Sequence, residues 1–101
     1  MKIGIPPKDL DYIVRSIQTR GEIDKAIVFG SRAKGMHKPY SDIDIAICGD
    51  NVSFDTISSL YSLLDQQGPL PYFFDIIDYA QIKNKELKEH IDRVGKVIFQ
   101  R

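Results

Sequence analysis

Residues 41–47 read Ser-Asp-Ile-Asp-Ile-Ala-Ile and alternate strictly, with an isoleucine at every second position. Successive side chains of a β-strand point to opposite faces, so this alternation predicts a strand with two different faces. The isoleucines would form an apolar face, whereas Asp42, Asp44 and Ala46 would share the other. The apolar face can pack against helices. The chain is therefore expected to build a sheet whose acidic side has a functional role.

Other helices and strands are predicted around this central strand. The segment at 72–77 follows a helix at the spacing of a βαβ crossover, so it should lie parallel to the strand at 41–47. The expected fold class is α/β, or α+β, with a small mixed sheet of three to four strands flanked by helices in one domain, residues 1–101. The remaining expected elements are a helix at about 7–20 capped by Gly21, a strand at 25–29, a helix from Ser53 to about Leu64, a helix over 82–94 and a short strand at 96–99.

The composition narrows the class of protein and its compartment. The 14 basic and 14 acidic side chains give a formal net charge of zero, which argues against a partner held chiefly through a nucleic-acid backbone. No stretch reaches the roughly 20 apolar residues that span a bilayer, and the N-terminus lacks the apolar core of a signal peptide. Cys48 is the only cysteine and cannot form an internal disulfide. We therefore expect a cytoplasmic protein that does not contact a membrane.

The paired carboxylates of the central strand predict a cation site. Asp42 and Asp44 lie two positions apart, which separates their Cα atoms by roughly 7 Å in a strand that rises about 3.3 Å per residue. Both side chains can therefore reach one or two hard cations. Two carboxylates this close repel each other in a dry site unless a cation lies between them. The alternative is a solvated strand face, which is less consistent with the depletion of Asp in strands.

The strand that precedes Gly30-Ser31 ends abruptly, and the turn that follows predicts phosphate binding. Glycine lets an anion approach exposed backbone N–H groups because no Cβ stands in the way. A helix that began after Ser31 would add the attraction of its N-terminal dipole. Arg32 is expected to contact the phosphates, whereas Lys34 and Lys38 add positive charge without an assigned role. Taken alone, Gly30-Ser31 is equally consistent with a simple tight turn.

The segments Gly30-Ser31-Arg32-Ala33-Lys34-Gly35 and Ser41-Asp42-Ile43-Asp44 together resemble the minimal nucleotidyltransferases (MNT) of the DNA polymerase β-like superfamily. The likeness runs from about residue 24 to residue 99. It implies the nucleotidyltransferase fold, with a Gly-Ser turn that holds a nucleoside triphosphate and paired aspartates that bind two Mg²⁺. The family pattern places a third carboxylate at Asp75. Asp78 is the alternative, although a residue three positions later would point to the opposite face of a regular strand.

The resemblance also implies a reaction, in which an acceptor hydroxyl attacks the α-phosphorus of a nucleoside triphosphate in line and pyrophosphate leaves. Two Mg²⁺ would stabilise the attacking and leaving oxygens. Asp75 would help to deprotonate the acceptor, and Ser31 with the adjacent amides would hold the β and γ phosphates. The expected catalytic and metal-binding residues are Asp42, Asp44 and Asp75, and the expected nucleotide-binding residues are Gly30, Ser31 and Arg32.

The acceptor is expected to come from a partner, because larger members of the superfamily carry acceptor-binding domains for which this chain has no room. Minimal members are commonly paired with a HEPN-domain protein, often as antitoxin and toxin, and some transfer AMP to a tyrosine of the toxin. The leading hypothesis is thus a protein adenylyltransferase that uses ATP and acts as an antitoxin. The main alternative is a non-catalytic module that neutralises its partner by contact, and transfer to a small molecule ranks last.

Two histidines lie outside these motifs, His37 in the loop after the Gly-Ser turn and His90 in the last helix. Neither has partners at the spacing of metal ligands. Both are therefore expected to face the solvent.

Overall fold

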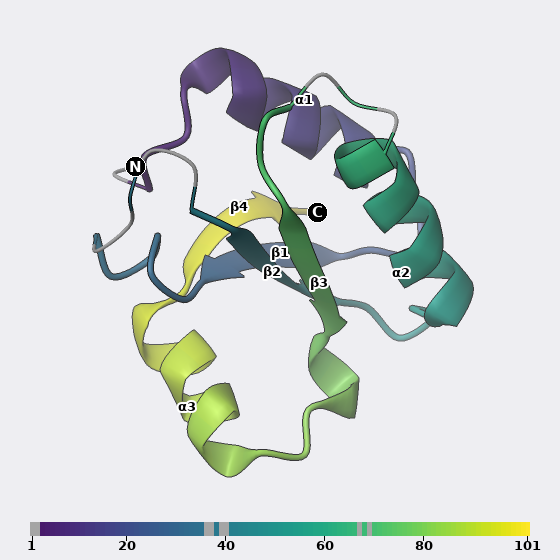
Figure 1. Ribbon diagram of the computed structural model, residues 1–101. Helices are drawn as coiled ribbons and strands as arrows, with labels where there is room; N and C mark the ends of the chain where they lie inside the picture. Colours follow the sequence, from purple (N-terminus) through teal and green to yellow (C-terminus); the bar gives the residue numbers. More distant parts are fainter. Residues whose placement is uncertain (1–2, 36–37, 39–40, 67, 69) are drawn as a thin grey trace.

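The computed structural model describes residues 3–35, 38, 41–66, 68 and 70–101, so the expectation for His37 lies outside the described residues. Figure 1 shows a twisted sheet with helices above and below it. A π-helical turn, Ser62–Gln66, continues the second helix, and a 3₁₀ turn, Tyr79–Gln81, precedes the third. The main elements are α1 (Pro7–Gln18), β1 (Lys25–Phe29), β2 (Ile43–Cys48), α2 (Phe54–Tyr61), β3 (Phe74–Asp78), α3 (Lys85–Val94) and β4 (Lys96–Gln100).

The four strands form one mixed sheet in the order β3-β2-β1-β4. β1 is antiparallel to both β2 and β4, whereas β2 and β3 run parallel, which confirms the predicted crossover through α2. In the parallel pair, Ile43 lies opposite Phe74 and Asp44 opposite Asp75. β3, which carries Asp75, is an edge strand and pairs with another strand on one side alone.

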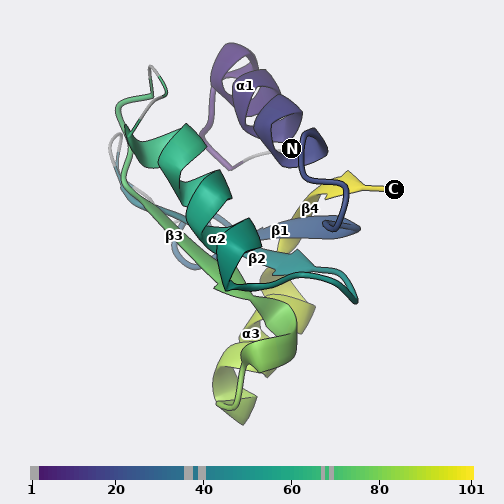
Figure 2. The same ribbon diagram turned by 90° about the vertical axis from the view of Figure 1, so that its right-hand side faces the viewer.

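Helices cover both faces of the sheet, α1 and α2 on one and α3 on the other (Figure 2). The larger core joins the isoleucine face of β2 to Ile13 and Ile17 of α1 and Leu60 of α2. The smaller core joins Ile91 of α3 to the opposite face of the sheet. The alternation predicted for β2 is therefore real, and its acidic face is the one that α3 partly covers.

Local sequence signals explain where the helices begin. Pro7 occupies the first turn of α1, where its missing N–H and fixed φ cost nothing. Ser53 and Thr56 form a capping box at α2, as expected for Ser53. The side chain of Asn84 accepts the N–H groups of Glu86 and Leu87 at the start of α3. Each cap satisfies donors that the first helical turn leaves unpaired.

Several predicted boundaries were wrong. The first helix ends at Gln18 with Thr19 as its C-cap, rather than near residue 20 with Gly21 as the cap. The central strand begins at Ile43, so Asp42 lies just before it. Residues 31–35 form a turn and not a helix, with the Lys34 N–H donating to the Gly30 carbonyl at 3.2 Å. The dipole that a helix beginning after Ser31 would have added is therefore not available.

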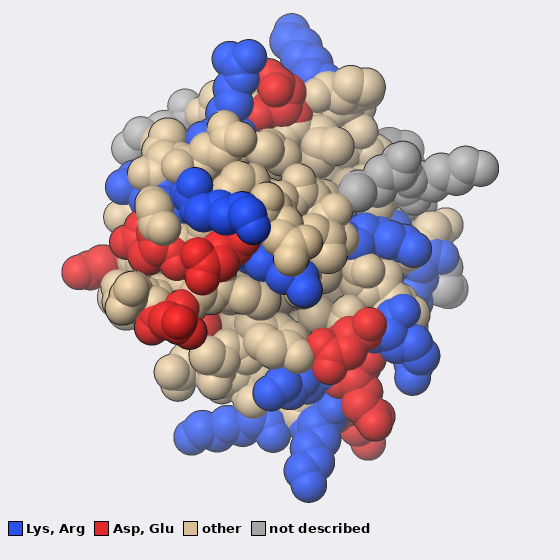
Figure 3. Space-filling view, turned by 180° about the vertical axis from the view of Figure 1, so that it is seen from behind, with Lys and Arg blue, Asp and Glu red and all other residues tan. Residues whose placement is uncertain are grey.

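Charges of both signs are mixed on the surface. On the face shown in Figure 3, acidic and basic side chains lie side by side, and neither sign forms a continuous surface among the described residues. Within the same part of the chain, no helix has the length and apolar character needed to cross a membrane.

Candidate active site

A pair of carboxylates from neighbouring strands forms the centre of the site. Asp44 of β2 and Asp75 of β3 are in register and therefore project from the same face of the sheet. Asp42 lies two residues before Asp44, and both Asp42 and Asp75 are exposed, whereas Asp44 is partly buried. Burial, followed by the charges of Asp75 and Asp42, raises the pKa of Asp44 from 3.8 to about 6. The charges of Asp42 and Asp75 therefore act on Asp44.

The acidic cluster has the chemistry of a site for a hard cation. Among the described residues the single ion pair joins Arg15 to Asp11, so no basic side chain there neutralises the three carboxylates. Carboxylate oxygens are the ligands that Mg²⁺ prefers. In the described part of the chain no three His, Cys, Asp or Glu side chains are yet gathered closely enough to hold a metal ion. The three carboxylates thus have the chemistry that suits Mg²⁺, but in this structure their side chains do not lie close enough together to coordinate one ion.

Asp78 was the alternative third carboxylate, and the structure places it elsewhere. It lies opposite Ile47 at the far end of β3, three residues from Asp75. Its side chain accepts the N–H of Ala80 at 3.1 Å and caps the 3₁₀ turn. Asp75, and not Asp78, is therefore the residue beside Asp44.

The turn after β1 lies directly against this cluster. Gly30 has φ +74°, a left-handed conformation that favours glycine. A Cβ built on Gly30 would overlap the Oδ2 atom of Asp44, so a side chain at this position would occupy the space of the carboxylate. The next residue, Ser31, is exposed. The structure therefore brings the predicted Gly-Ser turn and the predicted acidic cluster together.

Arg32 does not take the role predicted for it. Its side chain has no exposed surface, so it cannot contact a bound nucleotide as expected. The guanidinium donates to the carbonyls of Ile3 (3.2 Å), Gly4 (3.1 Å) and Ser41 (3.0 Å). Its Cζ lies 5.0 Å from the centre of the Tyr72 ring. Arg32 therefore connects the turn to the residue before Asp42 and to the approach to β3, and its role is structural.

His90 also differs from the prediction, because it is half-buried and contacts the turn. The Gly30 N–H donates to its Nε2 atom at 3.1 Å, and its ring packs edge-on against Phe29 with centroids 6.3 Å apart. Burial, followed by the charges of Lys34 and Arg93, lowers the pKa of His90. The spacing held a clue, since Leu87 and Ile91 mark the buried side of α3 and His90 lies between them.

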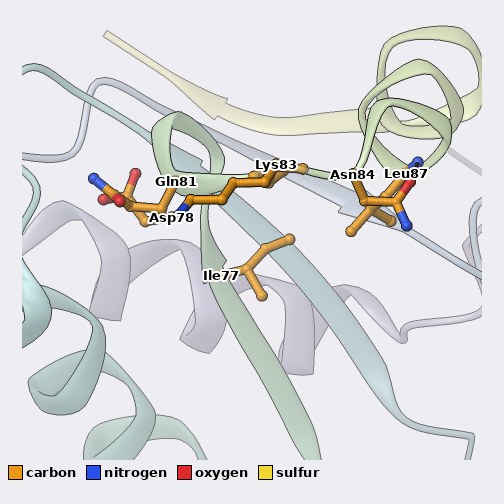
Figure 4. A pocket seen from close by; sticks show the side chains of 7 residues that line it. Ile77, Asp78, Gln81, Lys83, Asn84 and Leu87 are labelled. Atoms are coloured by element: carbon orange, nitrogen blue, oxygen red, sulfur yellow. Dashed lines mark hydrogen bonds between the residues drawn. The ribbon is translucent and has the colours of Figure 1, made fainter.

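A separate groove opens between the end of β3 and the start of α3 (Figure 4). It has a volume of about 350 Å³, and its lining includes the apolar side chains of Ile77, Ile82 and Leu87. None of the acidic cluster and none of the Gly-Ser turn lines it. We therefore treat it as distinct from the candidate active site.

The sequence is similar to those of known nucleotidyltransferases. A family model described as Polymerase beta, Nucleotidyltransferase matches residues 11–101. A Haemophilus influenzae protein named Probable protein adenylyltransferase MntA is 36% identical over 74 residues, which cover 69% of this chain and 60% of that protein. The chain thus spans less than two thirds of the length of this curated relative.

Two solved structures share the fold. One, described as a toxin-antitoxin with AMP-PNP, has a TM-score of 0.75 and 20% identity and covers 91% of this chain and 73% of its own. The other is a tri-AMPylated Shewanella oneidensis HEPN toxin in complex with MNT antitoxin, with a TM-score of 0.70, 18% identity and coverage of 93% and 71%. At such identities the likeness establishes the arrangement of helices and strands.

Proposed function

The chain belongs to the polymerase beta nucleotidyltransferase family, and from this premise we propose that it transfers AMP from ATP to a hydroxyl acceptor. The observation that carries the proposal is the pairing of Asp44 with Asp75 beside the Gly30-Ser31 turn. An acidic pair next to exposed backbone is suited to a substrate that combines a metal ion with phosphates. The relative named as a protein adenylyltransferase supports the choice of AMP.

Asp42, Asp44 and Asp75 would hold Mg²⁺, two ions in our proposal. Burial, followed by the charges of Asp75 and Asp42, raises the pKa of Asp44, and a bound cation would relieve the repulsion between these carboxylates. When bound, Mg²⁺ would supply positive charge that stabilises the oxygens on either side of the transferred phosphorus. The protein's contribution is a rigid pair of strands that keeps two of the three carboxylates side by side.

The chain's own groups would orient the two reactants. Ser31 and the neighbouring amides would bind the β and γ phosphates, so that pyrophosphate leaves toward the turn. In-line displacement then requires the acceptor to approach from the opposite side, which is the side of β3. Asp75 is exposed on this edge strand and would accept the proton of the acceptor hydroxyl. The partly buried Asp44 would remain between the two reactants.

We further propose that the acceptor is a tyrosine of a HEPN-type toxin and that the chain is the antitoxin of the pair. Support comes from the solved complex of a tri-AMPylated HEPN toxin with an MNT antitoxin, which shares the fold of this chain. An exposed carboxylate on an edge strand is accessible to a side chain of another protein. The rival function is neutralisation by contact alone, with an idle site.

One experiment separates transfer from neutralisation by contact. The protein and the HEPN-type product of a neighbouring gene are incubated with Mg²⁺ and ATP labelled on the α-phosphate, and the Asp42→Asn/Asp44→Asn double variant is run in parallel. Label on the partner with the wild type alone, located at tyrosine by mass spectrometry, is the expected result. Asp50→Asn serves as a control because Asp50 is an exposed carboxylate in a turn away from the cluster. Neutralisation of the toxin by the double variant, with no label in either reaction, would contradict transfer.

A further inference from the structure

The bond between His90 and Gly30 links α3 to the turn at the candidate active site. The two residues lie 60 positions apart in the sequence, and the Gly30 N–H donates to Nε2 of His90 at 3.1 Å. Packing of the imidazole against Phe29, the residue before Gly30, limits how the ring can turn. The contact is therefore held from two sides, by a hydrogen bond and by an aromatic neighbour.

The bond decides which backbone donors the turn can offer to a ligand. Because Nε2 accepts, His90 is neutral with its proton on Nδ1. The Gly30 N–H is occupied by His90 and is not available to an anion, so the next donor along the turn is the Ser31 N–H. The peptide plane between Phe29 and Gly30 is thereby fixed, and this plane sets the direction in which the chain enters the turn.

The same bond also keeps the turn against the acidic cluster. The Cα atom of Gly30 lies so close to Oδ2 of Asp44 that no Cβ would fit between them. Rotation of the Phe29-Gly30 peptide would move Gly30 relative to this carboxylate. Phosphates bound at Ser31 and a cation bound at Asp44 have to be held in register with each other, and a fixed turn provides this register.

We propose that His90 is a positioning residue, which fixes the Gly30-Ser31 turn so that Ser31 and its amides bind the triphosphate in register with Asp44. The proposal rests on the proposed function, because it assigns the turn to a triphosphate. His90 acts through Gly30 and does not touch the substrate. The charges of Lys34 and Arg93 act on its ring.

Three variants test this role by their affinity for Mg²⁺-ATP and for Mg²⁺ with inorganic tripolyphosphate, both measured by calorimetry. His90→Leu keeps a helix-forming, apolar side chain but removes the acceptor, and we expect binding of both probes to weaken about 5- to 10-fold, the range of one lost hydrogen bond. His90→Gln can return an acceptor to the position of Nε2 and should bind within about twofold of the wild type. Glu89→Leu, at an exposed neighbouring position of α3, is the matched control and should bind like the wild type.

A second measurement tests the hydrogen bond between Gly30 and His90 in the absence of nucleotide. Hydrogen exchange of the Gly30 amide, followed by NMR, should be faster in His90→Leu and near the wild-type rate in His90→Gln. Equal binding by all variants would overturn the proposal, and so would equal losses in His90→Leu and His90→Gln. If the wild type bound neither probe, the proposed function would fail, and Gly30 exchange would still decide whether His90 fixes the turn.

Discussion

Replacing Asp44 with asparagine should stabilise the metal-free protein while it removes a proposed metal ligand. The pKa of Asp44 rises from 3.8 to about 6, chiefly through burial, so its ionised form is disfavoured in the folded state. About two pKa units at about 1.4 kcal/mol each correspond to about 3 kcal/mol, and residual exposure of the side chain reduces this to about 1–3 kcal/mol. We expect Asp44→Asn to raise the free energy of unfolding by this amount at pH 8.

The raised pKa of Asp44 also determines how the stability gained by Asp44→Asn depends on pH. A carboxyl whose pKa is raised on folding contributes stability that is fully present below about pH 4 and is lost as the pH rises through about 6. The difference between the variant and the wild type should therefore be small at pH 4 and largest at pH 7–8. Urea unfolding in EDTA at pH 4, 5, 6, 7 and 8, followed by circular dichroism, measures it.

The control and the refuting result follow from the same curves. Asp50→Asn removes an exposed carboxylate outside the cluster and should leave the pH dependence of the wild type unchanged. Added Mg²⁺ should stabilise the wild type much more than Asp44→Asn. If Asp44→Asn were no more stable than the wild type at pH 8, or if the two proteins had the same pH dependence, the assignment of a strained carboxylate cluster would be wrong.

Three further substitutions test neighbouring features. Arg32→Lys should lower the free energy of unfolding by about 2–4 kcal/mol in urea titrations, because one ammonium group cannot reach the carbonyls of Ile3 and Ser41 together. Unchanged stability would contradict a structural role for the hydrogen bonds of the buried guanidinium. Gly30→Ala should lower the free energy of unfolding by about 1–3 kcal/mol and reduce transfer of labelled AMP at least about tenfold, since Gly30 has a left-handed φ and a Cβ there would overlap the carboxylate of Asp44; transfer at the wild-type rate would show that the turn can move. Asp75→Asn should slow transfer by about 10²–10⁴-fold with an unchanged circular dichroism spectrum, because Asp75 is exposed; a rate near that of the wild type would exclude it as the proton acceptor.

The parts of the site that could be predicted from sequence are those set by local periodicity. The alternation around Asp42 and Asp44 determines which side chains share a face, and the crossover spacing predicts that the strand at 72–77 runs parallel to the central strand. Asp75 itself was predicted from the family resemblance, because the direction of a strand does not fix its register. The helix cap at Ser53 was predictable as well, since the capping interaction spans three residues. Boundaries were less accurate because the end of a helix or strand depends on tertiary contacts, as at Gln18 and Ile43.

The roles of Arg32 and His90 could not be predicted in this way. An arginine beside a phosphate-binding turn has the same local sequence whether it points to a ligand or into the protein. The acceptors that bury Arg32 come from residues 28, 29 and 9 positions away. His90 finds its donor 60 positions away. Such contacts are formed by the packing of distant segments, and a single sequence with no structure does not encode them in any short pattern.

The bonds of Arg32 to Ile3 and Gly4 connect the first described residues to the candidate site. Ile3 has only 1% of its surface exposed, and its carbonyl shares one guanidinium with the carbonyl that precedes Asp42. Residues 3 and 4 thus hold Arg32, and with it the turn after Gly30, against the residue before Asp42. A shortened chain, or a tag that pulls on these residues, would loosen this turn from behind while every aspartate remained in place.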